Sequence, residues 1–122
     1  MVRDDAGQRV VGYFILRLGV SGPERARFAN YRLVLDERTD CKLATSVAED
    51  YRHQGVGKSM MEHALELARR VGRKRVLLAG GIQASNVHAI HFYTRFGFRV
   101  VGQFTTVRGE AQVDNFDMIL DL

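Results

Sequence analysis

Apolar residues recur along the chain with two different periods, and the change of period separates predicted strands from predicted helices. Densely apolar or alternating stretches, which are typical of buried or half-buried strands, cover residues 10–18, 27–35 and 42–48. The connections between these stretches are short and rich in glycine and polar residues. Because parallel strands need long crossover connections, we expect these three strands to form an antiparallel meander.

Helical spacing is strongest in residues 54–71, where apolar side chains return every three or four positions. A shorter apolar helix follows after Ser85 or Asn86, either of which can cap its first turn. Gly97 is a natural end for this second helix.

Further strands are predicted at residues 75–82, 98–107 and 116–122, which gives the order β-β-β-α-β-α-β-β. The fold class is therefore α/β (an α+β mixed sheet) and mostly antiparallel, and the first helix makes strands 42–48 and 75–82 a parallel pair. Gly80 and Gly81 inside a strand indicate a bulge or a close approach to the backbone. No repeat or linker interrupts the 122 residues, so we expect one domain over residues 1–122.

Composition narrows the class of protein without identifying it. Hydrophobic residues make up 46% of the chain and charged residues 26%, as in ordinary globular domains. No apolar stretch approaches the roughly 20 residues that span a bilayer, and residues 1–5 lack the apolar core of a secretory signal. The single cysteine, Cys41, fits a reducing compartment. We therefore expect a cytoplasmic protein without a membrane partner, in which Cys41 is a small buried side chain.

The net charge of +4 suits an anionic ligand. The densest group of basic residues, within residues 69–75, closes the first helix, where the helix dipole favours positive charge. Neither an aromatic platform nor a recognisable nucleic-acid-binding module accompanies these residues. No nucleic acid partner is therefore predicted.

The turn that joins the third strand to the first helix carries the clearest sign of a ligand. Residues 52–57 read Arg-His-Gln-Gly-Val-Gly, and the first turn of a helix leaves backbone N–H groups without intrahelical partners. Gly55 and Gly57 lack Cβ atoms, so an anion can approach the backbone closely. Arg52, His53 and Lys58 surround the turn with positive or potentially positive groups. The turn predicts a phosphate or pyrophosphate site, with a tight turn that binds nothing as the alternative.

Two other motifs point to sites that we do not expect. Residues 57–59 read Gly-Lys-Ser, like the end of a nucleotide-binding P-loop, but Arg52 stands where that pattern needs glycine. His88 and His91 are three residues apart on the second helix, and no third ligand has suitable spacing. Neither an NTPase nor a metal site is therefore predicted.

Besides the glycine turn at residues 52–57, a second motif with a ligand-binding interpretation spans the second helix and the start of the next strand. It reads Asn86-x-x-Ala89-x-x-Phe92-Tyr93-x-x-x-Gly97-Phe98. In this order and over these elements, the two motifs together resemble the GNAT superfamily of acetyl-CoA-dependent N-acetyltransferases. The resemblance covers residues 10–122 and implies a GNAT-like sheet in which one parallel strand pair splays around the cofactor.

The resemblance also implies acetyl-CoA (coenzyme A) as the cofactor and a role for each matching residue. The pyrophosphate would be bound by the turn and the first turn of the helix, at Arg52, His53, Gln54, Gly55, Val56, Gly57, Lys58 and Ser59. The strand edge at Val47 and Ala48 would bind the pantetheine arm, and Asn86 would contact the pantetheine or its thiol end. Tyr93 would donate a proton to the departing thiolate. Without the motif, Tyr93 would be interpreted as a core aromatic.

The chain departs from the family pattern in two ways. We expect the family's usual first strand, and the one or two helices after it, to be absent. No carboxylate lies inside the predicted strand 42–48, where many members carry a general base. Asp36, Asp40, Glu49 and Asp50 flank that strand. The base stays unassigned between a water-relayed carboxylate and an amine that arrives already deprotonated.

The leading hypothesis is an N-acetyltransferase in which a primary amine attacks acetyl-CoA directly. The acceptor is a small-molecule or peptide amine that the sequence does not identify, although Asp114 and Asp117 could attract its positive charge. The alternative is a non-catalytic acyl-CoA-binding or structural module that has lost its acceptor site. An exposed sheet edge where the first strand is absent would favour a homodimer.

Overall fold

The computed structural model describes residues 2–3, 10–47 and 55–122. In these residues the chain forms six strands and three helices. The elements in order are β1 (Val2–Arg3), β2 (Val10–Leu18), α1 (Gly22–Ala29), β3 (Asp40–Val47), α2 (Val56–Arg70), β4 (Arg75–Gln83), α3 (Val87–Arg95), β5 (Arg99–Arg108) and β6 (Ala111–Asp121).

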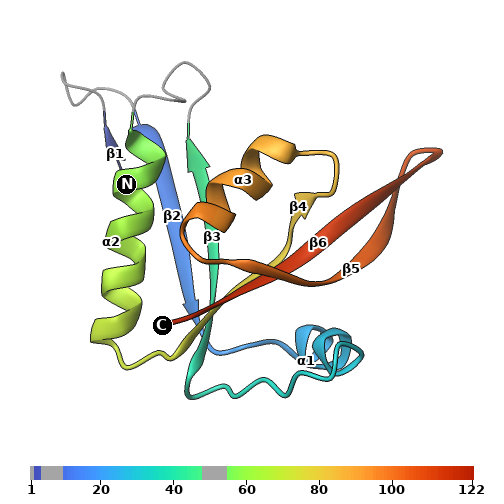
Figure 1. Ribbon diagram of the computed structural model, residues 1–122, viewed down its shortest axis with the longest axis horizontal. Coiled ribbons are helices and arrows are strands. Elements are labelled where there is room, and N and C mark those ends of the chain that lie inside the picture. Colours follow the sequence, from blue (N-terminus) through green and yellow to red (C-terminus); the bar gives the residue numbers. More distant parts are fainter. Residues whose placement is uncertain (1, 4–9, 48–54) are drawn as a thin grey trace.

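All six strands belong to one sheet, in the order β1-β2-β3-β4-β6-β5 (Figure 1). β3 and β4 pair in parallel, whereas the other neighbouring pairs are antiparallel. The predicted mixed sheet, mostly antiparallel with one parallel pair, is confirmed. α2 forms the crossover between the two parallel strands, as such a connection requires.

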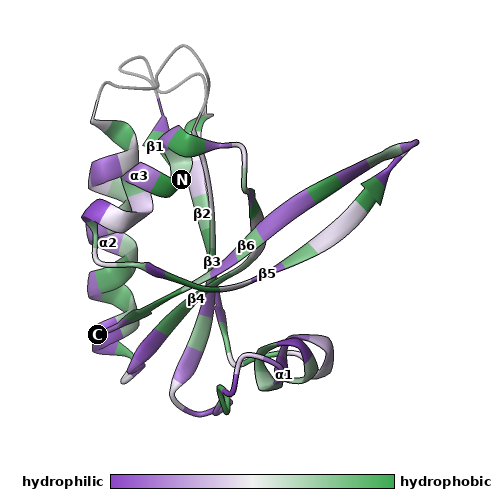
Figure 2. Cartoon of the chain, turned by 45° about the vertical axis from the view of Figure 1, so that its right-hand side comes forward, coloured by the Kyte–Doolittle hydropathy of each residue, from purple (hydrophilic) through white to green (hydrophobic). Residues whose placement is uncertain are grey.

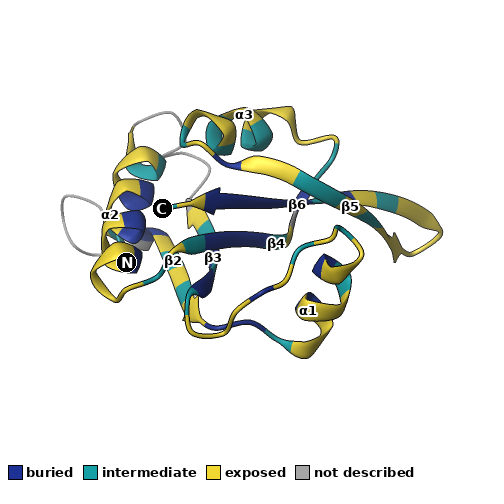
Figure 3. Cartoon of the chain, turned by 60° about the horizontal axis from the view of Figure 1, so that its bottom comes forward, coloured by how far each residue is buried: buried dark blue, intermediate teal, exposed yellow. Residues whose placement is uncertain are grey.

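Helices cover both faces of the sheet. α3 and α1 lie on opposite sides of β4 and β6 (Figure 3). On one face, α2 and α3 pack against apolar side chains of β3, β4 and β6 in the larger core. On the other face, α1 buries Phe28 against Leu77 and Ile119. β4 and β6 carry buried residues on both faces, and they form the rigid centre on which the site is built.

α2 forms because its apolar residues fall on one helical face. The buried members are Met60, Met61, Ala64, Leu65 and Ala68. Charged residues occupy the remaining surface of the helix, so polar and apolar segments alternate along it (Figure 2). None of the helices in the described part of the chain is long and apolar enough to cross a membrane.

The prediction of a strand over residues 27–35 is wrong, because helix α1 occupies its first part. Ser21 caps this helix by accepting a hydrogen bond from the backbone N–H of Glu24 at 3.2 Å, and Pro23 stands in the first turn, where its missing N–H costs nothing. After the helix, Arg32 adopts a left-handed φ of 63°. The apolar alternation at Tyr31, Leu33 and Leu35 is real, but these side chains belong to a loop that covers the core around α1. The observed order is therefore β-β-α-β-α-β-α-β-β.

The glycine pair in β4 makes the predicted bulge. The ladder between β4 and β6 is regular up to Leu78 and resumes at Ile82, with a register shift between them. The predicted end of the third strand at Ala48 lies outside the described residues, and β3 itself extends to Val47.

Candidate active site

The two parallel strands separate partway along their length. Their ladder ends where Lys42 pairs with Leu77. Beyond that point β3 stays paired with β2 as far as Val47, and β4 stays paired with β6 as far as Gln83. The carboxyl ends of β3 and β4 therefore diverge, and such divergence between parallel strands is a common place for ligands in α/β sheets.

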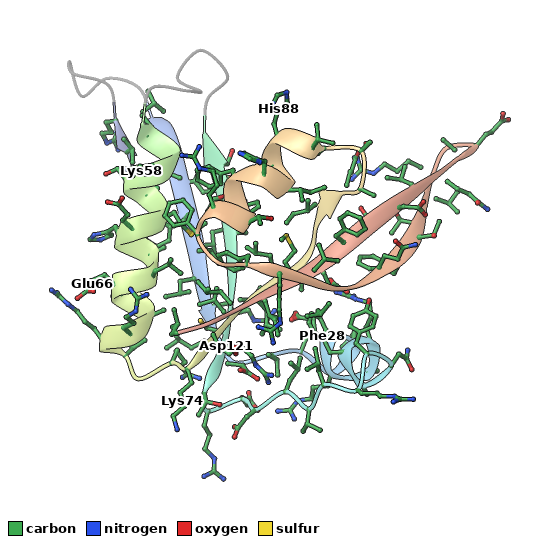
Figure 4. The ribbon with its side chains drawn as sticks, in the orientation of Figure 1. Phe28, Lys58, Glu66, Lys74, His88 and Asp121 are labelled. Carbon is green, nitrogen blue, oxygen red and sulfur yellow. The ribbon has the colours of Figure 1, made fainter. Side chains whose placement is uncertain are left out.

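A cleft of about 580 Å³ opens at this separation, between α2 on one side and α3 on the other. This volume is within the range of small-molecule and cofactor pockets. Its lining comes from β3, β4 and both helices: Thr45, Ser46, Gly55, Gly57, Lys58, Met60, Ile82, Asn86, His88, Ala89, Phe92, Tyr93 and Arg95. Figure 4 shows Lys58 near the start of α2 and His88 near the start of α3, at the same end of the molecule.

The N-terminus of α2 faces this cleft without a side-chain cap. Gly55 occupies the cap position with a left-handed φ of 82°, which glycine adopts without strain. The backbone N–H of Ser59 binds the carbonyl of Gly55 at 3.0 Å, whereas the N–H groups of Val56, Gly57 and Lys58 make no backbone hydrogen bond within residues 55–122, as expected for a first helical turn. These donors and the helix dipole favour an anion here.

The charged groups of the cleft have one sign. Lys58 and Arg95 line it together with His88, and no aspartate or glutamate is among the described lining residues. A cleft with this lining concentrates anionic ligands. The positive charge and the bare helix end act on the same region.

Tyr93 lies in the cleft with its hydroxyl 2.8 Å from Oγ1 of Thr45 on β3. Its ring packs edge-on against Phe92 and Phe98. The hydroxyl therefore sits at the strand separation on a ring that packing holds in place. Both hydroxyls can donate or accept, so Thr45 can stabilise either protonation state of the phenol.

Asn86 caps the first turn of α3. Its side-chain oxygen accepts a hydrogen bond from the backbone N–H of Ala89 at 3.1 Å, which caps the helix as predicted. The same residue lines the cleft, so the capped first turn of α3 lies at the site. From this start, one helical face presents Ala89, Phe92 and Tyr93 towards the cleft.

The structure brings together Gly55, Gly57, Lys58, Asn86 and Tyr93 among the predicted site residues. Val56 and Ser59 lie in the first turn of α2 beside them, and Val47 ends β3. The predicted residues Ala48, Arg52, His53 and Gln54 lie outside the described residues.

Sequence reasoning missed the parts of the lining that do not belong to a motif. His88 and Arg95 lie seven positions apart on α3, on the same face as Phe92 of the motif, and this helical spacing was a usable signal for a shared face. Thr45 on β3 and Ile82 after the bulge carry no comparable signal, because only the separation of β3 from β4 brings them to the cleft.

The acidic residues considered for base or acceptor roles do not line the cleft where they are described. Asp36 accepts a hydrogen bond from the backbone of Arg38, and Asp114 accepts one from Thr105. Asp40 and Asp117 are 1% and 0% exposed and each binds an arginine. The suggestion that Asp117 attracts the acceptor's charge is wrong, because burial and Arg27 occupy this carboxylate. Glu49 and Asp50 lie outside the described residues.

Comparison with known proteins identifies the family. Residues 2–98 match the model of the acetyltransferase (GNAT) family, and the chain belongs to this family. It is 33% identical over 92 residues to the [ribosomal protein bS18]-alanine N-acetyltransferase of Escherichia coli strain K12. That match covers 75% of this chain and 57% of the relative, so the chain spans little more than half of the relative's length. It is also 34% identical over 73 residues to the peptidyl-lysine N-acetyltransferase YjaB of Salmonella typhimurium, covering 60% of this chain and 43% of that protein.

Solved structures show the same fold at low sequence identity. A ribosomal-protein-alanine N-acetyltransferase from Brucella melitensis superimposes with a TM-score of 0.76 and 23% identity, over 99% of this chain and 67% of that one. The yncA protein of Salmonella typhimurium, solved with its cofactor acetyl-CoA, gives 0.73 and 20% identity, over 94% of this chain and 60% of that one. The predicted GNAT fold is therefore confirmed.

Proposed function

We propose that this chain is an N-acetyltransferase that moves the acetyl group of acetyl-CoA to a primary amine. The observation that carries the proposal is the Tyr93 hydroxyl, held 2.8 Å from Thr45 in the cleft where β3 and β4 separate. Membership of the GNAT family, and relatives that are named N-acetyltransferases, support the same activity.

The lining of the cleft fits acetyl-CoA, which carries several phosphates and a long polar arm. The N–H groups at the start of α2 would bind the pyrophosphate, in the backbone of Val56, Gly57 and Lys58. Lys58 and Arg95 add positive charge to the same cleft. The pantetheine arm would lie along the β3 edge that β4 leaves at Lys42, close to Asn86.

Tyr93 would act as the general acid. The amine nitrogen forms a bond to the thioester carbonyl carbon, the bond from that carbon to sulfur breaks, and the thiolate takes the Tyr93 proton. The Thr45 hydroxyl can then donate a hydrogen bond to the phenolate oxygen of Tyr93, until a proton from water restores the phenol. Because no carboxylate is among the described lining residues, the proton of the attacking amine would leave to water, or the amine would bind in its neutral form.

The acceptor is proposed as a primary amine on a small molecule or a peptide. One relative is named for acetylation of an alanine of ribosomal protein bS18, and another for acetylation of peptidyl-lysine. Both names describe amines on polypeptides. A peptide amine is therefore the first acceptor to examine.

Thermal melting with acetyl-CoA, CoA and ATP-magnesium, measured side by side, tests the donor. A ligand that binds only the native state raises the melting temperature as its concentration exceeds Kd. We expect acetyl-CoA and CoA to raise it, and ATP-magnesium to raise it less. A panel of peptide and small-molecule amines, assayed by thiol release from acetyl-CoA, then tests the transfer.

Two outcomes would redirect the proposal. Stabilisation by ATP-magnesium equal to that by acetyl-CoA would contradict a coenzyme A site. Binding of acetyl-CoA without thiol release for any amine would favour the alternative, a non-catalytic acyl-CoA-binding module.

A further inference from the structure

The bulge in β4 lies where the active-site cleft begins. Leu78 of β4 pairs with Met118 of β6, and Ile82 pairs with Phe116. Three β4 residues, 79–81, therefore lie opposite the single residue Asp117. This surplus lengthens the path of β4 immediately after its last contact with β3 at Leu77.

The Asp117 carboxylate lies at the bulge and accepts hydrogen bonds from three residues around it. Its side chain is 0% exposed. It accepts hydrogen bonds from Nε and Nη2 of Arg27 at 2.7 and 3.0 Å, from the Tyr31 hydroxyl at 2.7 Å and from the backbone N–H of Gly80 at 3.0 Å. One carboxylate thus joins β6, the bulge of β4, helix α1 and the loop after that helix.

Tight packing leaves the bulge little freedom to move. Gly80 has a φ of 79°, and a Cβ atom there would lie 3.2 Å from the ring of Phe104. The Arg27 guanidinium stacks on that same ring, 4.2 Å from its centre. Tyr31 lies against Gly102, where a Cβ atom would come within 2.2 Å of its ring. The bulge is therefore held by backbone, charge and aromatic contacts together.

The α3 wall of the cleft depends on where β4 leaves the bulge. Ile82, the first residue paired again with β6, lines the cleft. The backbone N–H of Ala84 then binds the carbonyl of Asp114 at 2.8 Å, and Asn86 begins α3, which carries Tyr93. A change at the bulge would pass to Tyr93 through this short segment.

We propose that Asp117 is a positioning residue for acetyl-CoA binding, which it performs without touching the ligand. By holding Gly80, Arg27 and Tyr31 on one carboxylate, it keeps β4 on the bulged path that separates β4 from β3. The inference rests on the proposed function, because it needs acetyl-CoA as the ligand of the cleft. Arg27 and Tyr31 share this role as partners of the carboxylate.

The chain contains a matched control for this proposal. Asp40 is as deeply buried as Asp117 and binds Arg75 through Nε at 2.8 Å and Nη2 at 2.7 Å. It lies at the opposite end of the parallel pair, where β3 and β4 are still joined. Asp117→Asn and Asp40→Asn therefore make the same chemical change in similarly buried ion pairs, and only the first lies at the β4 bulge that precedes the cleft residue Ile82.

The experiment measures acetyl-CoA affinity by calorimetry, under conditions where urea unfolding shows each variant fully folded. We expect Asp117→Asn to weaken acetyl-CoA binding on the order of tenfold, a typical size for coupling between a distant residue and a ligand site. Asp40→Asn should bind within about twofold of the parent protein. Equal affinities for the two variants would overturn the proposal.

A milder variant decides the question if Asp117→Asn does not fold. Tyr31→Phe removes one hydrogen bond to the carboxylate and leaves the ring on Gly102 and the Arg27 pair in place. We expect acetyl-CoA affinity to fall about threefold, with faster hydrogen exchange at residues 80–86 and unchanged exchange in β2. Unchanged affinity and exchange in Tyr31→Phe would overturn the proposal. Failure of the unmodified protein to bind acetyl-CoA would contradict the proposed function itself.

Discussion

Each end of the β3–β4 pair has a buried aspartate–arginine ion pair, but the strands are joined at one end and separated at the other. At the closed end, Asp40 of β3 binds Arg75 of β4 and accepts the backbone N–H of Asp36 at 2.7 Å. At the open end, Asp117 binds Arg27 and the backbone of Gly80. The first carboxylate binds the two parallel strands to each other. The second binds β4 to β6, to helix α1 and to the loop after that helix.

This difference explains how one pair of strands can be rigid and still open. The closed end is further tied by Arg73, whose Nη1 donates to the carbonyl oxygens of Glu37 and Asp40 at 2.6 and 3.2 Å. At the open end, Thr45 of β3 forms a hydrogen bond with Tyr93 of α3, and the ladder between β3 and β4 has ended. Thr45 therefore lines an open cleft, while β4 is bonded through Gly80 to Asp117 on its other side.

The largest effect is expected at the open end, for Tyr93→Phe. Loss of a general acid typically lowers the rate by about 10²–10⁴-fold, and we expect the loss in kcat measured by thiol release with a working amine. Ring packing is preserved, so the melting temperature should change little. Tyr13→Phe, which removes an exposed hydroxyl on β2, is the control. Turnover of Tyr93→Phe within about twofold of the parent would show that Tyr93 is a core aromatic.

At the closed end, the largest effect should be on stability. Asp40→Ala leaves Arg75 without its partner, and breaking a buried ion pair in this way typically costs about 3–5 kcal/mol. Urea unfolding should show this loss, while the folded protein should still bind acetyl-CoA. The exposed pair Glu66–Arg70 on α2 gives the contrast, since Glu66→Ala should change stability by about 0.5 kcal/mol or less. A large loss of acetyl-CoA affinity in Asp40→Ala would end the distinction between the two ends.

A smaller effect is expected for Gly55→Val at the start of α2. The left-handed φ of 82° strains any residue with a Cβ atom, although no neighbouring atom lies within 4 Å of that position. The cap should therefore rearrange while the fold persists. Displacing one charge-assisted hydrogen bond to phosphate, worth about 1.5–3 kcal/mol, should weaken CoA binding about tenfold or more. Unchanged affinity by calorimetry would place the phosphate site elsewhere.

The smallest effect concerns alkaline pH and again the open end. Burial, followed by the hydrogen bond to Asp117, raises the pKa of Tyr31 to about 12, whereas an ordinary tyrosine titrates near 10. Between these values the unfolded chain loses the Tyr31 proton and the folded protein keeps it, so stability falls as the pH rises. Urea unfolding between pH 9 and about 11.5 should show a shallower fall for Tyr31→Phe than for the parent. Identical slopes would contradict a Tyr31 hydroxyl that is bonded to Asp117 in the folded protein.

The sequence was sufficient for the parts of the fold that rest on local rules. The apolar face of α2, the cap at Asn86 and the bulge at Gly80 all follow from residue spacing and backbone preference. The same reasoning failed at residues 27–35, where alternation in a loop looked like a strand. The local signal for the start of α1 was Ser21, which caps the helix by accepting from the N–H of Glu24, together with Pro23 in the first turn.

The site could be predicted only in part, because several of its residues are brought together by the tertiary structure and not by a local motif. The motifs named Gly55, Asn86 and Tyr93, which line one cleft in the structure. Thr45 could be recognised only once the strands were known to separate. The role of Asp117 was misjudged because its partner Arg27 lies 90 positions away, and no spacing rule connects two residues so distant.

The position of β6 has a consequence for biosynthesis. β6 is inserted between β4 and β5 in the sheet, yet the ribosome makes it after all the other described elements. Until it emerges, β4 has no partner on its outer edge and the carboxylate that shapes the bulge does not exist. The nascent chain can join β2, β3 and α2 early, because their contacts are local, whereas non-local pairing follows more slowly. Under the proposed function, coenzyme A would therefore bind only after β6 has paired with β4, because Ile82 of the cleft lining lies in the part of β4 that β6 holds.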